Sequence, residues 1–221
     1  MLPLRAVLFD FDGTLTDSLP LWLRAYHLAL DEFQLKLSDE EVLRRCFFRD
    51  WREVADDLGV CTELELKREV DRGLQQAFLS AALFPQARGI IEQCRERNLK
   101  TALVTSSPRA LIGTVAQRLD VHHLFDFVIC GDEVANYKPH PEPVLRALGA
   151  LECAPHEAIM IGDSTADVLA GKAAGTRTAL FMPDDHHRFH DTERLRATQP
   201  DFIFEDLDEL HMLLGLIRED A

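Results

Sequence analysis

Six short apolar segments recur along the chain and alternate with amphipathic ones. The apolar segments are rich in Val, Ile and Leu and lie at residues 5–10, 100–106, 125–131, 157–163, 177–182 and 200–206. Apolar positions at helical spacing mark the segments 86–97, 108–119, 141–150 and 165–174, and a last amphipathic helix is expected at 206–217. Nearly continuous apolar strands that alternate with helices predict an α/β fold, a parallel sheet with helices on both faces.

The alternation is interrupted after the first strand. Three amphipathic stretches, 19–33, 38–59 and 62–83, follow one another with no apolar strand between them. Ser38 with Glu41, and Thr62 with Glu65, form the capping-box pattern that starts a helix. The sequence therefore predicts an all-α insert, residues 16–83, in an α/β core formed by residues 1–15 and 84–221.

Composition and charge narrow the possible partners. The 221 residues suit one α/β domain with a smaller insertion, and no stretch approaches the roughly 18 apolar residues of a membrane span. The net charge of −14 repels nucleic-acid phosphates and anionic lipids, so we expect neither nucleic acid nor membrane as a partner. An anionic ligand would need a local cation.

The N-terminal residues and the cysteines suggest a location. The first apolar stretch is short and runs directly into acidic residues, unlike a signal peptide. The five cysteines are odd in number, widely spaced and without metal-ligand spacing. Reduced thiols in the cytoplasm are the expectation.

Polar side chains collect at the ends of the predicted strands. Asp10 and Asp12 follow the first strand, Thr105 and Ser106 the second, Lys138 the third, and Asp163 and Asp167 the fourth. Ligands of open parallel sheets bind at the carboxyl ends of the strands, which meet at one edge. The sequence therefore predicts one site that contains four acids, two hydroxyls and one lysine.

The acids of this site predict a metal ion. Asp10 and Asp12 lie two residues apart in extended chain and point the same way, and Asp163 and Asp167 lie one helical turn apart. Like charges about 4 Å apart repel by about 4 kcal/mol at an effective dielectric constant of 20. A divalent cation would relieve this repulsion, and a donor set of oxygens alone favours Mg²⁺.

The remaining groups suit a phosphate. Hydroxyls and amide groups at a helix start, together with Lys138, can hold phosphate oxygens. A carboxylate can attack phosphorus, while a neighbouring acid protonates the leaving oxygen and then activates water.

Four stretches, "DFDGT", "VTSS", "YKPHPE" and "GDSTAD", resemble in order and position the four motifs of the haloacid dehalogenase superfamily of phosphotransferases. The resemblance covers nearly the whole chain and implies a Rossmann-like core. The helical insert resembles the cap of the subgroup that contains phosphoglycolate phosphatases and β-phosphoglucomutases.

The resemblance implies a role for each acid and for the phosphate-binding groups. Asp10 would be the nucleophile and a Mg²⁺ ligand, and Asp163 a further ligand. Asp12 would be the general acid/base, with its backbone carbonyl on the metal. Thr105 and Ser106 would hold the phosphoryl group. Lys138 would steady Asp10 and the phosphate, and Asp167 would order the site. Dehalogenases of the superfamily lack an acid at the position of Asp12, so its presence favours phosphate esters.

The hypothesis is a Mg²⁺-dependent phosphatase that hydrolyses a small phosphomonoester, phosphoglycolate first, through an aspartyl-phosphate. β-Phosphoglucomutase and inorganic pyrophosphatase are alternatives, as is a phospho-receiver module, although a receiver needs neither Asp12 nor a long insert. The insert would close over the site. Arg45, Phe48 and Arg49 would either contact substrate or form an ordinary helix surface. The substrate, the pathway and the choice between monomer and homodimer stay open.

The segment 184–191 contains His186, His187 and His190. Three close histidines suggest a metal site, but a polar loop after the fifth strand is the simpler interpretation.

Overall fold

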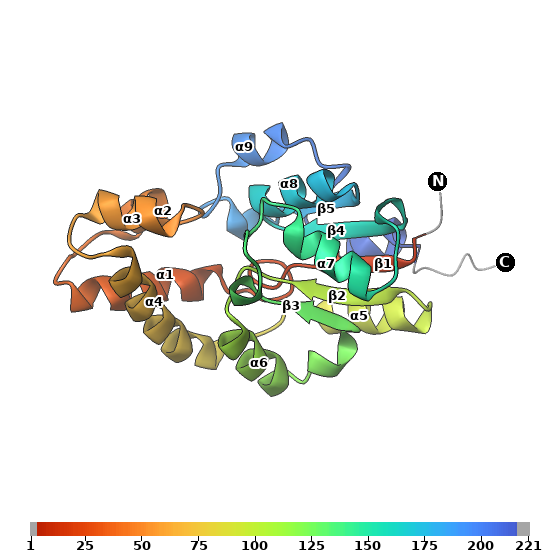
Figure 1. The fold of residues 1–221 in the computed structure, drawn as a ribbon, viewed down its shortest axis with the longest axis horizontal. Helices are drawn as coiled ribbons and strands as arrows, with labels where there is room; N and C mark the ends of the chain where they lie inside the picture. The colour runs from red at the N-terminus through yellow and green to blue at the C-terminus, as the bar shows by residue number, and fades with distance from the viewer. Residues whose placement is uncertain (1–3, 216–221) are drawn as a thin grey trace. The chain divides into compact units, whose positions relative to one another are not determined.

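The computed structural model describes residues 4–215. These residues form two compact units (Figure 1). Residues 18–81 form a helical unit, and the chain before and after them forms an α/β unit.

The α/β unit contains one six-stranded parallel sheet. Its strands are β1 (Ala6–Phe9), β2 (Lys100–Val104), β3 (Phe127–Ile129), β4 (Ala158–Gly162), β5 (Arg177–Phe181) and β6 (Phe202–Phe204), in the spatial order β3-β2-β1-β4-β5-β6. Each strand lies within one of the six predicted segments. The predicted α/β class is confirmed.

Helices cover both faces of the sheet. They are α5 (Ala87–Glu96), α6 (Arg109–Arg118), α7 (Glu142–Ala150), α8 (Thr165–Ala174) and the short α9 (Thr192–Ala197). Figure 1 shows α5 and α6 on one face and α7 and α8 on the other. Successive side chains of β1 point to opposite faces of the sheet. Ala6 and Leu8 are buried in a cluster with residues of α7 and α8 such as Leu148. The strands are mostly apolar, and the acidic side chains follow them at their carboxyl ends.

The last predicted helix is shorter than expected. A 3₁₀ turn (Leu207–Glu209) and a four-residue α10 (Leu210–Leu213) occupy the predicted range 206–217. Gly215 adopts a left-handed conformation with φ 66°, which ends the helix. Residues 216 and 217 lie outside the described residues.

The helical unit consists of α1 (Leu19–Glu32), α2 (Asp39–Cys46), α3 (Trp51–Leu58), α4 (Glu63–Ala77) and a 3₁₀ turn at Phe78–Ser80. Both predicted capping boxes start their helices. The stretch 38–59 forms two helices because Phe48 takes a left-handed φ of 52° and the Asp50 side chain then caps α3.

Two features hold the helical unit together. Helices α1 and α4 contact so closely that a Cβ on Gly73 would lie 2.7 Å from the carbonyl oxygen of Ala25. The Arg45 guanidinium donates to the Asp57 carboxylate (2.8 Å) and to its carbonyl oxygen (2.7 Å), which ties α2 to α3. Arg49 donates to the carbonyl of Arg45 (2.9 Å). Both candidate arginines therefore have partners inside this unit.

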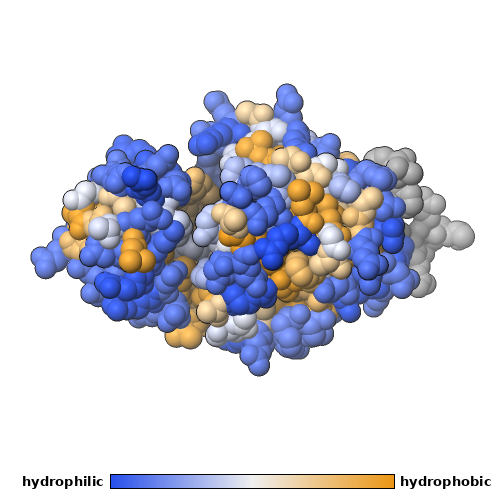
Figure 2. All heavy atoms as spheres, viewed as in Figure 1, coloured by the Kyte–Doolittle hydropathy of each residue, from blue (hydrophilic) through white to orange (hydrophobic). Residues whose placement is uncertain are grey.

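The surface is mainly hydrophilic on the face drawn in Figure 2. Among residues 4–215 no helix combines the length and the apolar character that a membrane span requires.

Candidate active site

The candidate site lies where the strand order of the sheet reverses. The chain runs from β1 outward to β2 and β3, then returns to place β4 on the other side of β1. Connections that leave in opposite directions open a crevice beyond the carboxyl ends of the strands, where ligands of such sheets bind. Asp10 follows β1 directly and Asp163 follows β4.

A tight turn positions the first two aspartates. The amide of Asp10 donates to Ile161 of β4 (2.8 Å), which extends the strand pairing to Asp10 itself. The carbonyl of Phe11 then accepts from the amides of Leu15 and Thr16, each at 3.0 Å. Gly13, with φ 74°, allows the chain to leave the sheet within this turn.

Lys138 joins two buried carboxylates. Its Nζ lies 2.7 Å from Asp10 Oδ1, 2.6 Å from Asp167 Oδ1 and 2.8 Å from the carbonyl oxygen of Val104. Burial alone would lower the pKa of Lys138, but the Asp10 and Asp167 charges raise it above its ordinary value. The lysine therefore stays charged and fixes both acids.

Asp167 is held from its other side by the start of α8. Its Oδ2 accepts from the amide (3.1 Å) and the hydroxyl (2.5 Å) of Ser164. A Cβ on Gly162 would lie 2.2 Å from Asp167 Cγ, so the carboxyl group occupies space that only glycine leaves. Both oxygens of Asp167 are engaged, which suits an ordering role.

The acidic group carries more negative charge than Lys138 offsets. Carboxylate oxygens of Asp10, Asp163 and Asp167 lie within 4.8 Å of one another, and all three residues are buried. Burial raises the pKa of Asp10 well above its ordinary value, Asp167 and Asp163 raise it further, and Lys138 only partly counteracts them. Three carboxylates beside one ammonium fit a divalent cation with oxygen ligands, as Mg²⁺ requires. Asp10 and Asp163, which directly follow β1 and β4, are the side chains that could hold it.

A serine contacts Asp12. Ser107 Oγ donates to Asp12 Oδ2 at 2.6 Å, and the Ser107 amide donates to Thr105 Oγ1 at 3.0 Å. Thr105 and Ser107 are buried, whereas Ser106 is exposed. Sequence reasoning stopped at the first two hydroxyls of "TSSP" and missed Ser107. The third hydroxyl before α6 was the available signal.

Two histidines of the segment 184–191 lie beside Asp163. His190 Nε2 is 3.0 Å from Asp163 Oδ2, and His186 Nδ1 is 4.0 Å from the same oxygen. Burial lowers the pKa of His186. His187 is exposed. The segment is a polar loop after β5, as predicted, but the side chains of His186 and His190 are buried in it.

Residues 7–181 match the model of a family described as haloacid dehalogenase-like hydrolase. The chain belongs to this family. The phosphoglycolate phosphatase of Escherichia coli is 29% identical over 239 residues, which cover 96% of this chain and 93% of that protein. The pyrophosphatase PpaX of Anoxybacillus flavithermus is 30% identical over 216 residues, with 96% and 98% covered.

A solved structure from Lactobacillus plantarum has the same fold. It superposes with a TM-score of 0.82 and 22% identity over 98% of this chain and 100% of that one. The predicted resemblance is confirmed, and membership in a hydrolase family makes this chain an enzyme and decides against the phospho-receiver alternative. The two relatives are named for different activities at nearly equal identity, so sequence identity alone does not decide the substrate.

Proposed function

We propose that this haloacid dehalogenase-like hydrolase is a Mg²⁺-dependent phosphatase of small phosphomonoesters and works through an aspartyl-phosphate. The observation that carries the proposal is the Asp10 carboxylate. It is buried beside Asp163 and Asp167, and it contacts Lys138 at the point where the strand order reverses. A carboxylate held there is a nucleophile with a fixed direction.

The reaction has two steps. An oxygen of Asp10 attacks phosphorus, the bond from phosphorus to the ester oxygen breaks, and Asp12 gives its proton to the leaving alcohol. Asp12 then takes a proton from water as that water attacks phosphorus, which releases inorganic phosphate and restores the Asp10 carboxylate. The hydrogen bond from Ser107 fixes the orientation of Asp12 for both transfers.

The other polar groups hold the charges in place. Mg²⁺ on Asp10 and Asp163 would neutralise carboxylate and phosphate charge. Lys138 keeps Asp10 oriented and adds positive charge in a protein whose net charge is −14. Thr105 and Ser106 would contact the phosphoryl oxygens, Ser106 from an exposed position at the strand end.

The helical unit is proposed to act as a cap that excludes water and selects the leaving group. Its place in the chain supports this role. The outgoing and returning connections pair with each other in the α/β unit, since Thr16 forms an antiparallel bridge with Leu83 and the amide of Phe84 donates to Leu15 (2.9 Å). This paired connection directly follows the turn that carries Asp12.

Phosphoglycolate is the first proposed substrate, and inorganic pyrophosphate is the second candidate because a pyrophosphatase is 30% identical to this chain. The test measures phosphate released from phosphoglycolate, pyrophosphate and several sugar phosphates, with Mg²⁺ and after chelation by EDTA. We expect Mg²⁺-dependent release from a monoester at the highest kcat/KM.

Asp10→Asn is the control for this assay, because the variant keeps the shape of the side chain and removes the nucleophile. Full activity of Asp10→Asn would contradict the proposal, as would hydrolysis that EDTA does not stop. Pyrophosphate as the best substrate would establish the second candidate. Isomerisation of a sugar phosphate with slow phosphate release would instead indicate a mutase.

A further inference from the structure

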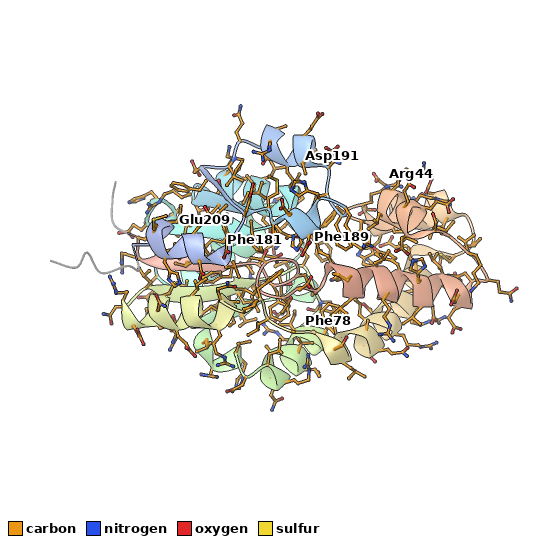
Figure 3. All side chains as sticks on the ribbon, turned by 180° about the vertical axis from the view of Figure 1, so that it is seen from behind. Arg44, Phe78, Phe181, Phe189, Asp191 and Glu209 are labelled. Carbon is orange, nitrogen blue, oxygen red and sulfur yellow. The ribbon has the colours of Figure 1, made fainter. Side chains whose placement is uncertain are left out.

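His186 is a buried imidazole whose ring nitrogens have no hydrogen-bond partner among the described residues. Its side chain is 2% exposed, and neither ring nitrogen forms a hydrogen bond with any of residues 4–215. The ring lies among Phe84, Phe181 and Phe189, of which Figure 3 labels the last two. A buried polar group without a hydrogen-bond partner has lost its hydrogen bonds to water and has not replaced them. A ligand that bonds to a ring nitrogen of His186 would therefore stabilise the buried imidazole.

Two further ligand atoms lie next to this ring. One nitrogen each of His186 and His190 and a carboxylate oxygen of Asp163 lie within 4.8 Å of one another. The His190 side chain is 4% exposed and that of Asp163 2%. Zinc bonds to nitrogen and oxygen are about 2.0–2.2 Å long, which places the ligand atoms of a tetrahedral site roughly 3.5 Å apart. The His190–Asp163 contact of 3.0 Å and the His186–Asp163 contact of 4.0 Å lie on either side of this value.

We propose that His186, His190 and Asp163 form a second metal site, which takes a divalent transition metal of the Zn²⁺ class. Two imidazole nitrogens and one carboxylate favour Zn²⁺ over Mg²⁺, which prefers oxygen ligands. Three protein ligands leave a fourth position for water or another small ligand.

The site is linked to the acidic group through one residue. Asp163 belongs to both sets: its Oδ2 faces the histidines, and its Oδ1 is 3.5 Å from the Thr14 hydroxyl. A metal on the histidines therefore competes for Asp163 with the cation beside Asp10. Zn²⁺ then inhibits Mg²⁺-dependent turnover, a consequence that rests on the proposed function, whereas the site itself does not.

Calorimetric titration of the whole protein with Zn²⁺ tests the site without any assay of activity. His186→Phe keeps an aromatic ring among the phenylalanines and removes both nitrogens, so the metal-free variant should melt at or above the temperature of the native protein. His190→Gln removes the second ligand. His187→Gln is the matched control, since His187 belongs to the same segment but is 49% exposed.

We expect His186→Phe and His190→Gln each to weaken Zn²⁺ binding at least about tenfold, as happens when a metal site loses a supporting group. His187→Gln should bind Zn²⁺ as tightly as the native protein does. All variants keep the five cysteines, so zinc held by thiols would be equal in each. Unchanged affinity in both ligand variants, or no Zn²⁺ binding by the native protein, would overturn the site.

Inhibition of phosphate release by Zn²⁺ tests separately whether the two metal sites share Asp163. Zn²⁺ added with saturating Mg²⁺ should inhibit phosphate release by the native protein and by His187→Gln, and inhibit His186→Phe at least about tenfold less strongly. Equal inhibition of the native protein and His186→Phe would contradict the shared role of Asp163. A protein inactive on every ester would contradict the proposed function, and the titration would still decide the metal site.

Discussion

The charge on a few buried residues explains the chemistry proposed for this hydrolase. Lys138 contacts Asp10 and Asp167 at 2.7 and 2.6 Å, while Asp163 adds a third acid nearby. Burial is the largest cause of the raised pKa of Asp10, and the charges of Asp167 and Asp163, which one ammonium only partly offsets, raise it further. This surplus of negative charge favours a divalent cation with oxygen ligands beside Asp10.

The pH dependence of stability tests whether negative charge and burial raise the pKa of Asp10. A carboxyl with a folded pKa above its ordinary value of 3.8 stabilises the fold fully below pH 4 and loses that contribution as pH rises through the folded pKa. Asp10→Asn does not titrate, so without metal it should be increasingly more stable than the native protein as pH rises from about 4. Denaturant unfolding at several pH values measures the difference, and Mg²⁺ should reduce it. A difference that is constant with pH would show that Asp10 carries no raised pKa.

The role of Asp12 as general acid/base predicts how substitutions of Asp12 and Ser107 change kcat. Asp12→Asn should lower kcat by roughly 10²–10⁴-fold, the contribution of a general acid/base. Ser107→Ala should lower kcat less and shift the pH profile of kcat, because Asp12 loses the hydroxyl that donates to it at 2.6 Å. Steady-state assays from pH 5 to 9 give both values. If Ser107→Ala lowers kcat with no change in the pH profile, Ser107 does not act through Asp12.

At the scale of the elements, the sequence predicted what depends on local pattern. The six strands, helices α5 to α8 and both capping boxes follow from apolar periodicity and from single spacings such as Ser38 to Glu41. The break between α2 and α3 was missed because it depends on a left-handed Phe48, a conformation that no local preference of phenylalanine indicates.

The site was predictable only in part, because some of its contacts do not depend on local sequence pattern. Strand order in a parallel sheet brings the strand ends together, so Asp10, Lys138 and Asp163 could be grouped from sequence alone. Contacts made by loops could not. Ser107 reaches Asp12 across 95 positions of the chain, and His190 reaches Asp163 across 27. Such contacts depend on tertiary packing, not on spacing.

The junction of β4 and α8 gives a prediction for a single element. Gly162→Ala should displace the Asp167 carboxyl, because the new Cβ would lie 2.2 Å from its Cγ. We expect a stability loss of about 1–3 kcal/mol, as for other overpacked cores, and a loss of phosphatase activity. Gly149 is on the exposed side of α7, and a Cβ there would meet no described atom within 4 Å outside its own turn of helix, so Gly149→Ala should be neutral or stabilising by up to about 1 kcal/mol. Denaturant unfolding and phosphate release compare the two variants. Equal effects would show that the space at Gly162 does not position Asp167.

At the scale of the whole molecule, the α/β unit contains every residue assigned to the chemistry, and the helical unit is inserted into it at one paired connection. The net charge of −14 disfavours anionic ligands over the molecule as a whole. Lys138 and the proposed Mg²⁺ supply the positive charge that a phosphate ester needs. This division leaves the reaction to one unit and assigns the choice of substrate, in our proposal, to the other.

In the proposed mechanism, phosphorus becomes bonded to Asp10 during turnover. Acid quenching of the enzyme in its first turnovers, followed by borohydride reduction and peptide mass spectrometry, measures this directly, since reduction converts an aspartyl-phosphate to homoserine. We expect homoserine at position 10, dependent on both Mg²⁺ and substrate, and none in Asp10→Asn. Rapid Mg²⁺-dependent phosphate release with position 10 left as aspartate, or with the modification at another residue, would contradict it.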